Sequence, residues 1–334
     1  MIYKEKIFDS HIKESFSKDE LQTIATSKFF ITGGTGFTGR WIVSTISKLF
    51  KGQDQPSIVI VSRSQTKAQK IFAKYGNIEV TNWSNLNQSA GLHKHQERVI
   101  GFHASVPAAS GATIEFEDID SYGKKTEFFA NWLGEEFPNP SFVNLSSGAV
   151  YKRPISGRIL ENQAVIETFD MTPYDLVKIK DEKIVLELTQ AKIIVGTNPR
   201  LFSFAGPGID IPGNFALGNF IDDALQGRAV RVTGSGGSER SYMSPIDMGI
   251  WILKASIYPI TNTIHIGSPQ GLKMSEIASL VAQIFGNGQV NISGEQSTVP
   301  ESYVPETQLT EKLFKIQEII NFEKSLIFWK KQIS

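Results

Sequence analysis

Two side chains that could move a proton stand four residues apart near the expected start of a helix. Tyr174 and Lys178 form a Tyr-x-x-x-Lys pattern, and Tyr174 alone among the eight tyrosines has a lysine four residues later. Residues at this spacing share one face of a helix, so the ammonium can stabilise a phenolate and lower the tyrosine pKa. The pair predicts a phenol that exchanges a proton with a substrate hydroxyl. The alternative is an ordinary surface tyrosine and lysine.

A pair of serines, Ser146-Ser147, follows the apolar run Ser141–Leu145. If that run is a strand of a parallel sheet, the serines lie at its carboxyl edge, where open α/β sheets bind ligands. A hydroxyl there can hydrogen-bond the oxygen of a reacting carbonyl or hydroxyl group, and we assign this role to Ser147. The alternative is a serine that caps a helix or forms a turn.

A glycine-rich turn joins the apolar run Phe29–Thr32 to an apolar-periodic segment. Gly33 would allow the sharp turn, Gly36 the approach of the backbone to a pyrophosphate, and Gly39 close packing of the helix on the sheet. The free N–H groups at the helix start would face the phosphates. The flanking strand and helix favour dinucleotide binding over a glycine turn without a ligand.

The end of the second strand bears on which dinucleotide is bound. It reads Val61-Ser62-Arg63-Ser64, without the Asp or Glu that usually bonds both ribose hydroxyls of NAD. Arg63 and the serines could instead hold a 2′-phosphate, with the guanidinium stacked on adenine. We therefore favour NADP slightly over NAD, the alternative being an ordinary exposed arginine.

Metal chemistry has little support in the sequence. His93 and His95 could suggest a metal-binding pair, but they lie in a polar loop with no third ligand evident. The chain has no cysteine, which excludes disulfides and thiolate metal sites. We expect a solvated loop and no metal site.

Alternating strands and helices must position these residues, and the apolar pattern predicts them. The expected strands are Phe29–Thr32, Ser57–Ser62, Ile78–Val80, Arg98–His103, Ser141–Leu145 and Lys192–Val195, and the expected helices are Phe37–Phe50, Thr66–Tyr75, Asp120–Leu133 and Pro173–Gln190. Continuous apolar strands suit a parallel sheet that is buried on both faces. The alternation predicts right-handed crossovers and an α/β fold with a Rossmann-type doubly wound parallel sheet.

The regular alternation of expected strands and helices ends after Arg200. A loop rich in glycine and proline precedes expected helices at Asn219–Leu225, Ile246–Ala255, Ser275–Phe285 and Glu323–Lys331 and an expected strand at Gln226–Gly237. We expect a helical extension at residues 1–27, a dinucleotide-binding domain at 28–200, and a smaller α/β substrate-binding region at 201–334, with some return of the chain to the first domain.

The balance of basic and acidic residues bears on which binding partners the protein could have. The 34 basic and 34 acidic residues give a formal net charge of zero, so no basic field favours nucleic acid or an acidic membrane. The N-terminus is charged at Lys4, Glu5, Lys6 and Asp9 and lacks a long apolar run. We expect neither a signal peptide nor a membrane span, and a cytoplasmic protein by default.

Together these motifs resemble the extended short-chain dehydrogenase/reductase family, in its sugar-nucleotide epimerase/dehydratase branch. The resemblance covers about residues 28 to 330. The matching segments are Thr32–Gly39, His103–Ser105, Leu145–Tyr151, Tyr174–Lys178, Arg200–Phe202, Gly206–Gly208, Val232–Gly237, Arg240–Tyr242, Asp247 and His265–Ser268.

The resemblance implies a role for each matching residue. Ser147 would hold the substrate oxygen, Tyr174 would be the acid/base, and Lys178 would bind the nicotinamide ribose and tune Tyr174. The cofactor site would also include Gly33, Gly36, Phe37, Thr38, Gly39, Arg63, Ala104 and Ser105, and the nucleotide-sugar site would include Ser147, Ser203, Asn219 and Arg240. Arg240 would grip the diphosphate through charge-assisted bonds, the alternative being a salt bridge within the second domain. A homodimer through the helices at 120–133 and 173–190 is also implied.

Departures from the family pattern narrow the reaction. The 4,6-dehydratases of the family carry an Asp-Glu pair where this chain has Gly148 and Ala149, neither of which can carry a proton. The position where epimerases often have a substrate-contacting Asn is Ser203, and the acid usual after the third strand is absent from Thr81-Asn82-Trp83. The first departure argues against dehydration, and the last loosens the adenine site.

Several functions remain compatible with these residues. We place first an NAD(P)-dependent epimerase of a nucleotide-activated sugar, and beside it an NADPH-dependent reductase of a keto-sugar nucleotide. A non-catalytic NADP-sensing protein is disfavoured because it need not keep Ser147, Tyr174 and Lys178 together. A steroid-like or flavonoid-like substrate is disfavoured by Arg240. Fold does not decide among substrates.

Overall fold

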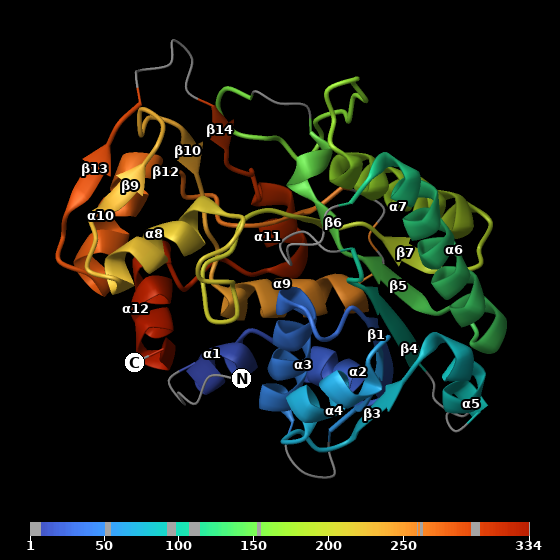
Figure 1. The fold of residues 1–334 in the computed structure, drawn as a ribbon. Helices are drawn as coiled ribbons and strands as arrows, with labels where there is room; N and C mark the ends of the chain where they lie inside the picture. Colours follow the sequence, from blue (N-terminus) through green and yellow to red (C-terminus); the bar gives the residue numbers. More distant parts are fainter. Residues whose placement is uncertain are drawn as a thin grey trace.

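A six-stranded parallel sheet forms the centre of the protein. The computed structural model describes residues 8–50, 55–91, 98–106, 114–151, 155–258, 260, 263–294 and 301–333. The strands are β1 (Ser27–Thr32), β2 (Ser57–Val61), β3 (Ile78–Thr81), β4 (Arg98–His103), β5 (Ser141–Asn144) and β7 (Val195–Thr197). Their order is β3-β2-β1-β4-β5-β7 (Figure 1), and each neighbouring pair is parallel. The chain therefore reverses direction across the sheet between β1 and β4, which confirms the doubly wound, Rossmann-type fold.

Helices cover both faces of this sheet because its strands carry apolar side chains on both faces. Phe29 and Ile31 of β1 belong to one apolar cluster with Trp41 of α3 (Phe37–Leu49), whereas Phe30 belongs to another with Phe129 of α6 (Ile119–Glu136). Helix α4 (Gln65–Phe72) lies on the α3 side. Helices α6 and α7 (Pro173–Gln190) lie together on the opposite side (Figure 1).

Helix α7 begins and ends where the sequence predicts. The Thr172 side chain accepts a hydrogen bond from the Asp175 backbone N–H, the Asp175 carboxylate accepts one from the Thr172 N–H, and Pro173 occupies the first turn. Such a reciprocal cap satisfies backbone donors that the helix cannot pair internally. The cap sets where Tyr174 stands at the sheet edge.

Two N-terminal helices, α1 (Asp9–Glu14) and α2 (Lys18–Ala25), pack against α3 and α9 (Pro245–Ile257). Glu20 of α2 accepts hydrogen bonds from Lys254 Nζ at 2.6 Å and from the Tyr258 hydroxyl at 2.7 Å. His11 Nε2 lies 3.2 Å from Asp247 Oδ1. Although α9 comes late in the chain, it packs against α3 and β5, so the chain returns to the Rossmann-type part.

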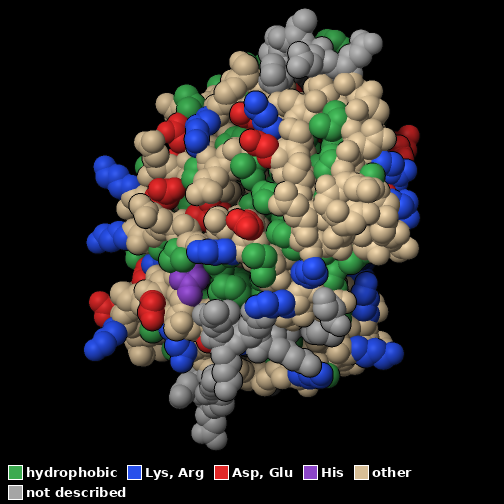
Figure 2. Space-filling view, turned by 90° about the vertical axis from the view of Figure 1, so that its left-hand side faces the viewer, with side chains coloured by type: hydrophobic (Ala, Val, Ile, Leu, Met, Phe, Trp, Pro, Cys, Tyr) green, Lys and Arg blue, Asp and Glu red, His purple; other side chains and the backbone are tan. Residues whose placement is uncertain are grey.

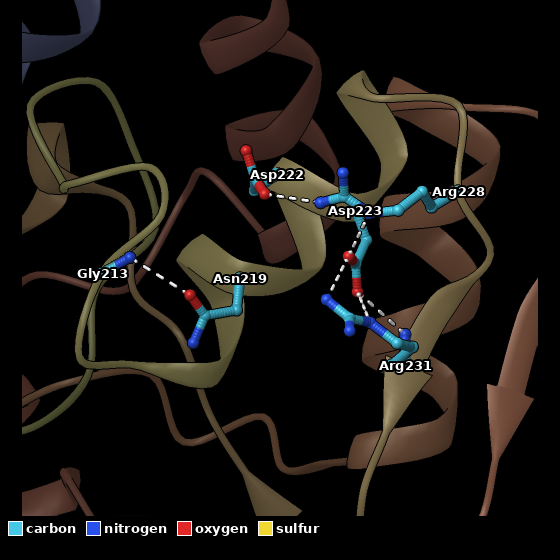
Figure 3. A network of polar contacts seen from close by, with 6 residues as sticks. All are labelled: Gly213, Asn219, Asp222, Asp223, Arg228 and Arg231. Carbon is cyan, nitrogen blue, oxygen red and sulfur yellow. Dashed lines mark hydrogen bonds and ion pairs between the residues drawn. The ribbon is translucent and has the colours of Figure 1, made fainter.

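The remaining C-terminal elements enclose a second apolar core. Helices α8 (Ala216–Leu225), α10 (Met274–Phe285) and α12 (Phe322–Ile333) contribute to it, as does β9 (Val230–Val232), which pairs in parallel with β13 (Val290–Ile292). Asp223 of α8 is 2% exposed and accepts bonds from Arg228 Nε at 2.9 Å and Arg231 Nη2 at 2.7 Å (Figure 3). These charge-assisted bonds tie α8 to β9.

The face on the α12 side carries a band of hydrophobic side chains at mid-height, with lysines and arginines beside it (Figure 2). A cavity of about 260 Å³ is bordered by Trp41 of α3, the loop at Ile209 and Ile211, and Trp329 of α12. The two cores therefore meet along an apolar junction. None of the helices in the described residues is both long enough and apolar enough to cross a membrane.

The sequence reading of two strands was wrong in extent. The strand expected at Lys192–Val195 is β7 at Val195–Thr197, because Lys192 adopts a left-handed φ of 61° in the turn after α7. The strand expected at Gln226–Gly237 is only β9. Elements that the sequence did not indicate are α5 (Leu86–Gly91), β6 (Ser146–Ser147), β8 (Arg200–Leu201), β10 (Glu239–Arg240), β11 (His265–Ile266), β12 (Leu272–Lys273), β13, β14 (Ser302–Tyr303) and α11 (Gln308–Phe314).

Candidate functional site

The glycine-rich loop lies at the carboxyl end of β1, beside the end of β4. Gly33 has a φ of 66°, and a methyl group there would lie 2.1 Å from the Ala104 carbonyl oxygen. Only glycine therefore fits, both because of the sharp turn and because the chain after β4 is so close. A methyl group on Gly39 would lie 2.5 Å from Gly34 Cα. The close approach expected of Gly39 is thus to the loop itself rather than to the sheet.

Several predicted cofactor residues meet at this loop. Gly36 is the N-cap of α3, and Phe37 and Thr38 form the first turn of that helix. The Ala104 N–H donates to the Thr32 carbonyl oxygen at 3.2 Å, and the Ser105 hydroxyl lies 3.2 Å from His103 Nε2. The structure thus brings the ends of β1 and β4 together around the N-terminus of α3, where backbone N–H groups can receive phosphate oxygens.

Arg63 is exposed and lies two residues after the end of β2. Its charge acts on the Tyr122 hydroxyl of α6 and opposes the burial that raises the pKa of that phenol. Ser64 caps α4 by accepting a hydrogen bond from the Lys67 N–H at 3.4 Å, and Ser62 accepts one from the Ser64 N–H at 3.2 Å. These serines therefore already stabilise the turn at which a 2′-phosphate is predicted.

Ser147, Tyr174 and Lys178 come together at the end of β5. Ser147 Oγ accepts a hydrogen bond from the Ala149 N–H at 3.1 Å, and the Ser147 side chain is also hydrogen-bonded with Tyr174. The Lys178 ammonium lies 5.8 Å from the centre of the Tyr174 ring and donates to the Leu145 carbonyl oxygen at 2.7 Å. Strand β6, just after β5, and helix α7 therefore bring the three predicted catalytic residues together.

Burial decides the protonation of this group. Burial raises the pKa of Tyr174, and the hydrogen bond with the Ser147 side chain only partly opposes that rise. The sequence led us to expect that Lys178 lowers this pKa. In the structure the cost of burying a phenolate is the larger effect, so Tyr174 is a neutral phenol at neutral pH.

The position of the missing dehydratase acids is filled by other side chains. A methyl group on Gly148 would lie 2.6 Å from the Tyr303 hydroxyl and 2.7 Å from Cε1 of Phe202. Tyr303 belongs to β14, far along the chain, and its hydroxyl is also close enough to raise the pKa of Tyr174. Sequence reasoning missed Tyr303, because only the C-terminal packing brings it to this edge of the sheet.

The predicted substrate residues of the C-terminal region lie in different settings. Arg240 Nη2 donates to Glu301 Oε2 at 2.8 Å, the salt bridge that was the alternative to diphosphate binding. Asn219 Oδ1 accepts from the Gly213 N–H at 3.2 Å and so holds the preceding loop against α8 (Figure 3). Ser203 follows β8, and its carbonyl oxygen accepts from the Met243 N–H at 3.0 Å.

A second buried polar cluster lies beside the first. Arg200 donates to Glu182 Oε2 at 2.7 Å and to the Tyr151 hydroxyl at 2.6 Å, and this hydroxyl lies 2.7 Å from His265 Nε2. Burial lowers the pKa of His265 to about 3, so its imidazole is neutral. These residues join β8 and β11 to α7.

Within the ranges that the structure describes, no three or more His, Cys, Asp or Glu side chains group together in a way that could hold a metal ion. His93 and His95 lie outside those ranges.

Two buried residues that the sequence did not indicate lie near Lys178. They are Asp181, one turn along α7, and Thr126 of α6, joined by a 2.7 Å hydrogen bond. The i, i+3 spacing of Lys178 and Asp181 was a signal that could have been found.

Comparisons with known proteins agree with this architecture. The model of the NAD dependent epimerase/dehydratase family matches residues 29–256. UDP-glucuronic acid decarboxylase 1 of Xenopus tropicalis is 24% identical over 128 residues, which are 38% of this chain and 30% of that protein. The chain thus matches about a third of the length of this curated relative.

Two solved structures extend the comparison over almost the whole chain. Epimerase Mth375 of Methanothermobacter thermautotrophicus superposes with a TM-score of 0.76 at 17% identity, covering 97% of this chain and 95% of that one. UDP-glucuronic acid 4-epimerase of Bacillus cereus, solved with UDP-glucuronic acid and NAD, has a TM-score of 0.70 at 18% identity, covering 92% and 100%. At these identities the likeness shows the fold.

Proposed function

Because the chain belongs to the NAD dependent epimerase/dehydratase family, we propose that it is an NAD(P)-dependent enzyme that epimerises a nucleotide-activated sugar by hydride transfer. Its neighbours in sequence and structure are sugar-nucleotide enzymes, among them epimerases and a decarboxylase. The observation that carries the proposal is the grouping of Ser147, Tyr174 and Lys178 near the carboxyl end of β5, at the same sheet edge as the glycine-rich loop.

The residues present fit a nicotinamide dinucleotide. The loop at Gly33 leaves no room for a side chain, and α3 begins directly after it, so backbone N–H groups are offered to a pyrophosphate. Lys178 uses one ammonium proton on Leu145 and retains two for ribose hydroxyls. When bound, the nicotinamide would supply the carbon that accepts a hydride and returns it.

Tyr174 would move the proton that accompanies the hydride. Its phenolate takes the proton from a sugar hydroxyl as that carbon is oxidised, and its phenol returns the proton when the carbon is reduced on the other face. The Ser147 O–H would donate to the same sugar oxygen and hold it within reach of Tyr174. Because burial raises the pKa of Tyr174, we expect activity to rise with pH through neutrality.

The packing around Gly148 favours epimerisation over 4,6-dehydration. Dehydration needs an acid at this position to remove water, and here the Tyr303 hydroxyl and the Phe202 ring occupy the space. The same packing is compatible with hydride transfer, for which the nicotinamide would accept the hydride and the three residues above would handle the proton. We assign Arg240 to binding of the substrate diphosphate. The diphosphate would have to replace Glu301 as the partner of the Arg240 guanidinium.

A second candidate is an NADPH-dependent reductase of a keto-sugar nucleotide. The observation that favours it is the exposed Arg63 after β2, at a position where an acid would favour NAD. The two candidates differ in how the cofactor is used. An epimerase returns the hydride and keeps its cofactor, whereas a reductase consumes NADPH and releases NADP.

The first test is to identify the cofactor by native mass spectrometry of the purified protein, before and after addition of NAD and NADP. UDP-glucose, UDP-glucuronic acid and dTDP-glucose are then supplied, and their C4 epimers are followed by proton NMR. We expect a co-purifying cofactor and one epimerised sugar. Tyr174→Phe should lower the rate about 100-fold to 10,000-fold, because the proton transfer is lost.

Tyr75→Phe is the matched control, since Tyr75 lies between α4 and β3, away from the three residues. This variant should retain the wild-type rate. A protein that arrives empty and oxidises NADPH with a keto-sugar nucleotide would favour the reductase. If Tyr174→Phe turned over every substrate as fast as the wild type, the assignment of Tyr174 would be wrong.

A further inference from the structure

A fully buried carboxylate stands one helical turn beyond Lys178. Asp181 is 0% exposed and Lys178 is 3% exposed, and both belong to the buried face of α7. Asp181 Oδ1 accepts a hydrogen bond from the Thr126 hydroxyl at 2.7 Å, while Oδ2 has no hydrogen-bond partner among the described residues. Burying an ionised acid with an unsatisfied oxygen costs free energy. A buried Asp181 near the predicted catalytic residues therefore needs a compensating positive charge.

Lys178 is the cation that can compensate Asp181. Its ammonium donates to the Leu145 carbonyl oxygen rather than to Asp181. Both side chains are buried, and opposite charges attract each other more strongly in a protein interior than in water. Burial lowers the pKa of Lys178, and the charge of Asp181 acts against that loss. Burial likewise raises the pKa of Asp181, and the charge of Lys178 opposes that rise.

The hydrogen bonds around Asp181 run in one direction. A carboxylate only accepts, so the Thr126 hydroxyl donates its single proton to Asp181 and must itself accept from His103 Nε2, 3.1 Å away. His103 is neutral because burial lowers its pKa to about 3. Its Nδ1 therefore accepts from the Thr32 hydroxyl at 2.9 Å. The chain of bonds ends beside Gly33, at the glycine-rich loop.

We propose that Asp181 is the buried counter-ion that keeps the Lys178 ammonium charged and, through Thr126 and His103, joins its position to the glycine-rich loop. Asp181 is a positioning residue, since it acts through Lys178 and touches no reacting atom. The pairing of the Lys178 and Asp181 charges follows from the contacts above. The role of this pairing in catalysis rests on the proposed function. The other charged or titratable groups that interact with the pair are Tyr174, Lys180 and Glu182 of α7 and His103 of β4. Lys125 of α6 acts on His103.

The test is to titrate Lys178 directly. In protein labelled with carbon-13 lysine, the Cε resonance of Lys178, assigned by its loss in Lys178→Arg, is followed from pH 6 to 11. In Asp181→Asn we expect Lys178 to lose its proton at least about one pH unit earlier than in the wild type, a tenfold change in the ratio of ammonium to amine. Glu187→Gln, an exposed change of the same kind on α7, should leave this titration unmoved.

A second measurement needs no variant that could misfold. In wild-type protein labelled with carbon-13 aspartate, the chemical shift of the Asp181 carboxyl carbon should be that of a carboxylate at pH 7. This chemical shift should change in the pH range where Lys178 loses its proton. A protonated Asp181 at pH 7, or the same Lys178 titration in Asp181→Asn as in the wild type, would overturn the proposal.

Binding of NAD separates this proposal from the proposed function. With NAD as the probe, the affinity of Asp181→Asn should fall more steeply between pH 7 and pH 10 than that of the wild type or Glu187→Gln. Equal pH dependence in all three proteins would contradict the positioning role. If NAD and NADP bound to none of them, the proposed function would fail, whereas the lysine titration would still decide the charge pairing.

Discussion

Gly148 shows how a single residue can restrict the chemistry of a site. Its lack of a side chain might suggest an empty position, but the Tyr303 hydroxyl and the Phe202 ring fill the space. Both side chains come from outside the segment that contains Gly148, and their rings pack at a tilt of 38° with centroids 4.9 Å apart. An acid could not be restored at this position without moving the C-terminal part of the chain.

Gly148→Ala should therefore destabilise the protein by about 1 to 3 kcal/mol through overpacking. Urea denaturation measures the change. Gly234→Ala is the matched control, because Gly234 has no atom within 4 Å of an added methyl group and no positive φ. Combining Gly148→Ala with Tyr303→Phe should recover part of the loss. An unchanged unfolding midpoint for Gly148→Ala would mean that the packing around Gly148 is looser than described.

At the scale of elements, buried charges join segments that are distant in sequence. Helix α2 is held to α9 by Glu20, which is 8% exposed, and by Lys254, which is 3% exposed. Burial alone would raise the pKa of Glu20, but its hydrogen bonds with Lys254, Ser17 and Tyr258 outweigh burial and lower it. Because the folded pKa lies below the unfolded one, this stabilisation is present above about pH 4.5 and is lost as the pH falls.

Glu20→Gln should lower the free energy of unfolding by about 3 to 5 kcal/mol at pH 7, since Lys254 is left as an unpaired buried cation. The loss should shrink as the pH falls below 4.5, where the wild type also loses this carboxylate. Urea denaturation at pH 7 and pH 3.5 tests both parts. Glu14→Gln, at an exposed glutamate of α1, is the control, and equal stability of the two variants at pH 7 would contradict the prediction.

At the scale of the whole molecule, α6 and α7 present apolar side chains to solvent on their outer surface. Phe128 of α6 is 51% exposed and Leu186 of α7 is 55% exposed. The resemblance to the short-chain dehydrogenase/reductase family implied a homodimer through these helices, and that remains a prediction. Such exposed apolar groups on paired helices suit an interface between two copies.

Light scattering should therefore find a dimer, and Leu186→Glu should shift it to the monomer because a charge would be buried at the interface. Circular dichroism should show that the variant stays folded, since Leu186 is exposed. Ile327→Glu, a similar change at a 42% exposed residue of α12, should remain dimeric. A monomeric wild type at working concentration would remove the predicted dimer.

Local patterns in the sequence were sufficient for much of the fold. The glycine-rich loop, the bounds of α7 and the strands of the central sheet other than β7 follow from apolar periodicity, helix caps and glycine geometry, which act between residues close in the chain. Ser147, Tyr174 and Lys178 could be predicted for the same reason, since each lies at the end of a recognisable element. Their roles remain predictions.

The rest was decided by tertiary packing. Strands β10, β12 and β14 are two residues long each, so no periodicity reveals them, and they form only because distant segments pair. Tyr303 reaches Gly148, and Thr126 reaches Asp181, across separations that no local pattern encodes. The pKa of Tyr174 illustrates the difference best. Sequence spacing placed a lysine nearby, but the degree of burial, which outweighs it, depends on everything packed around the phenol.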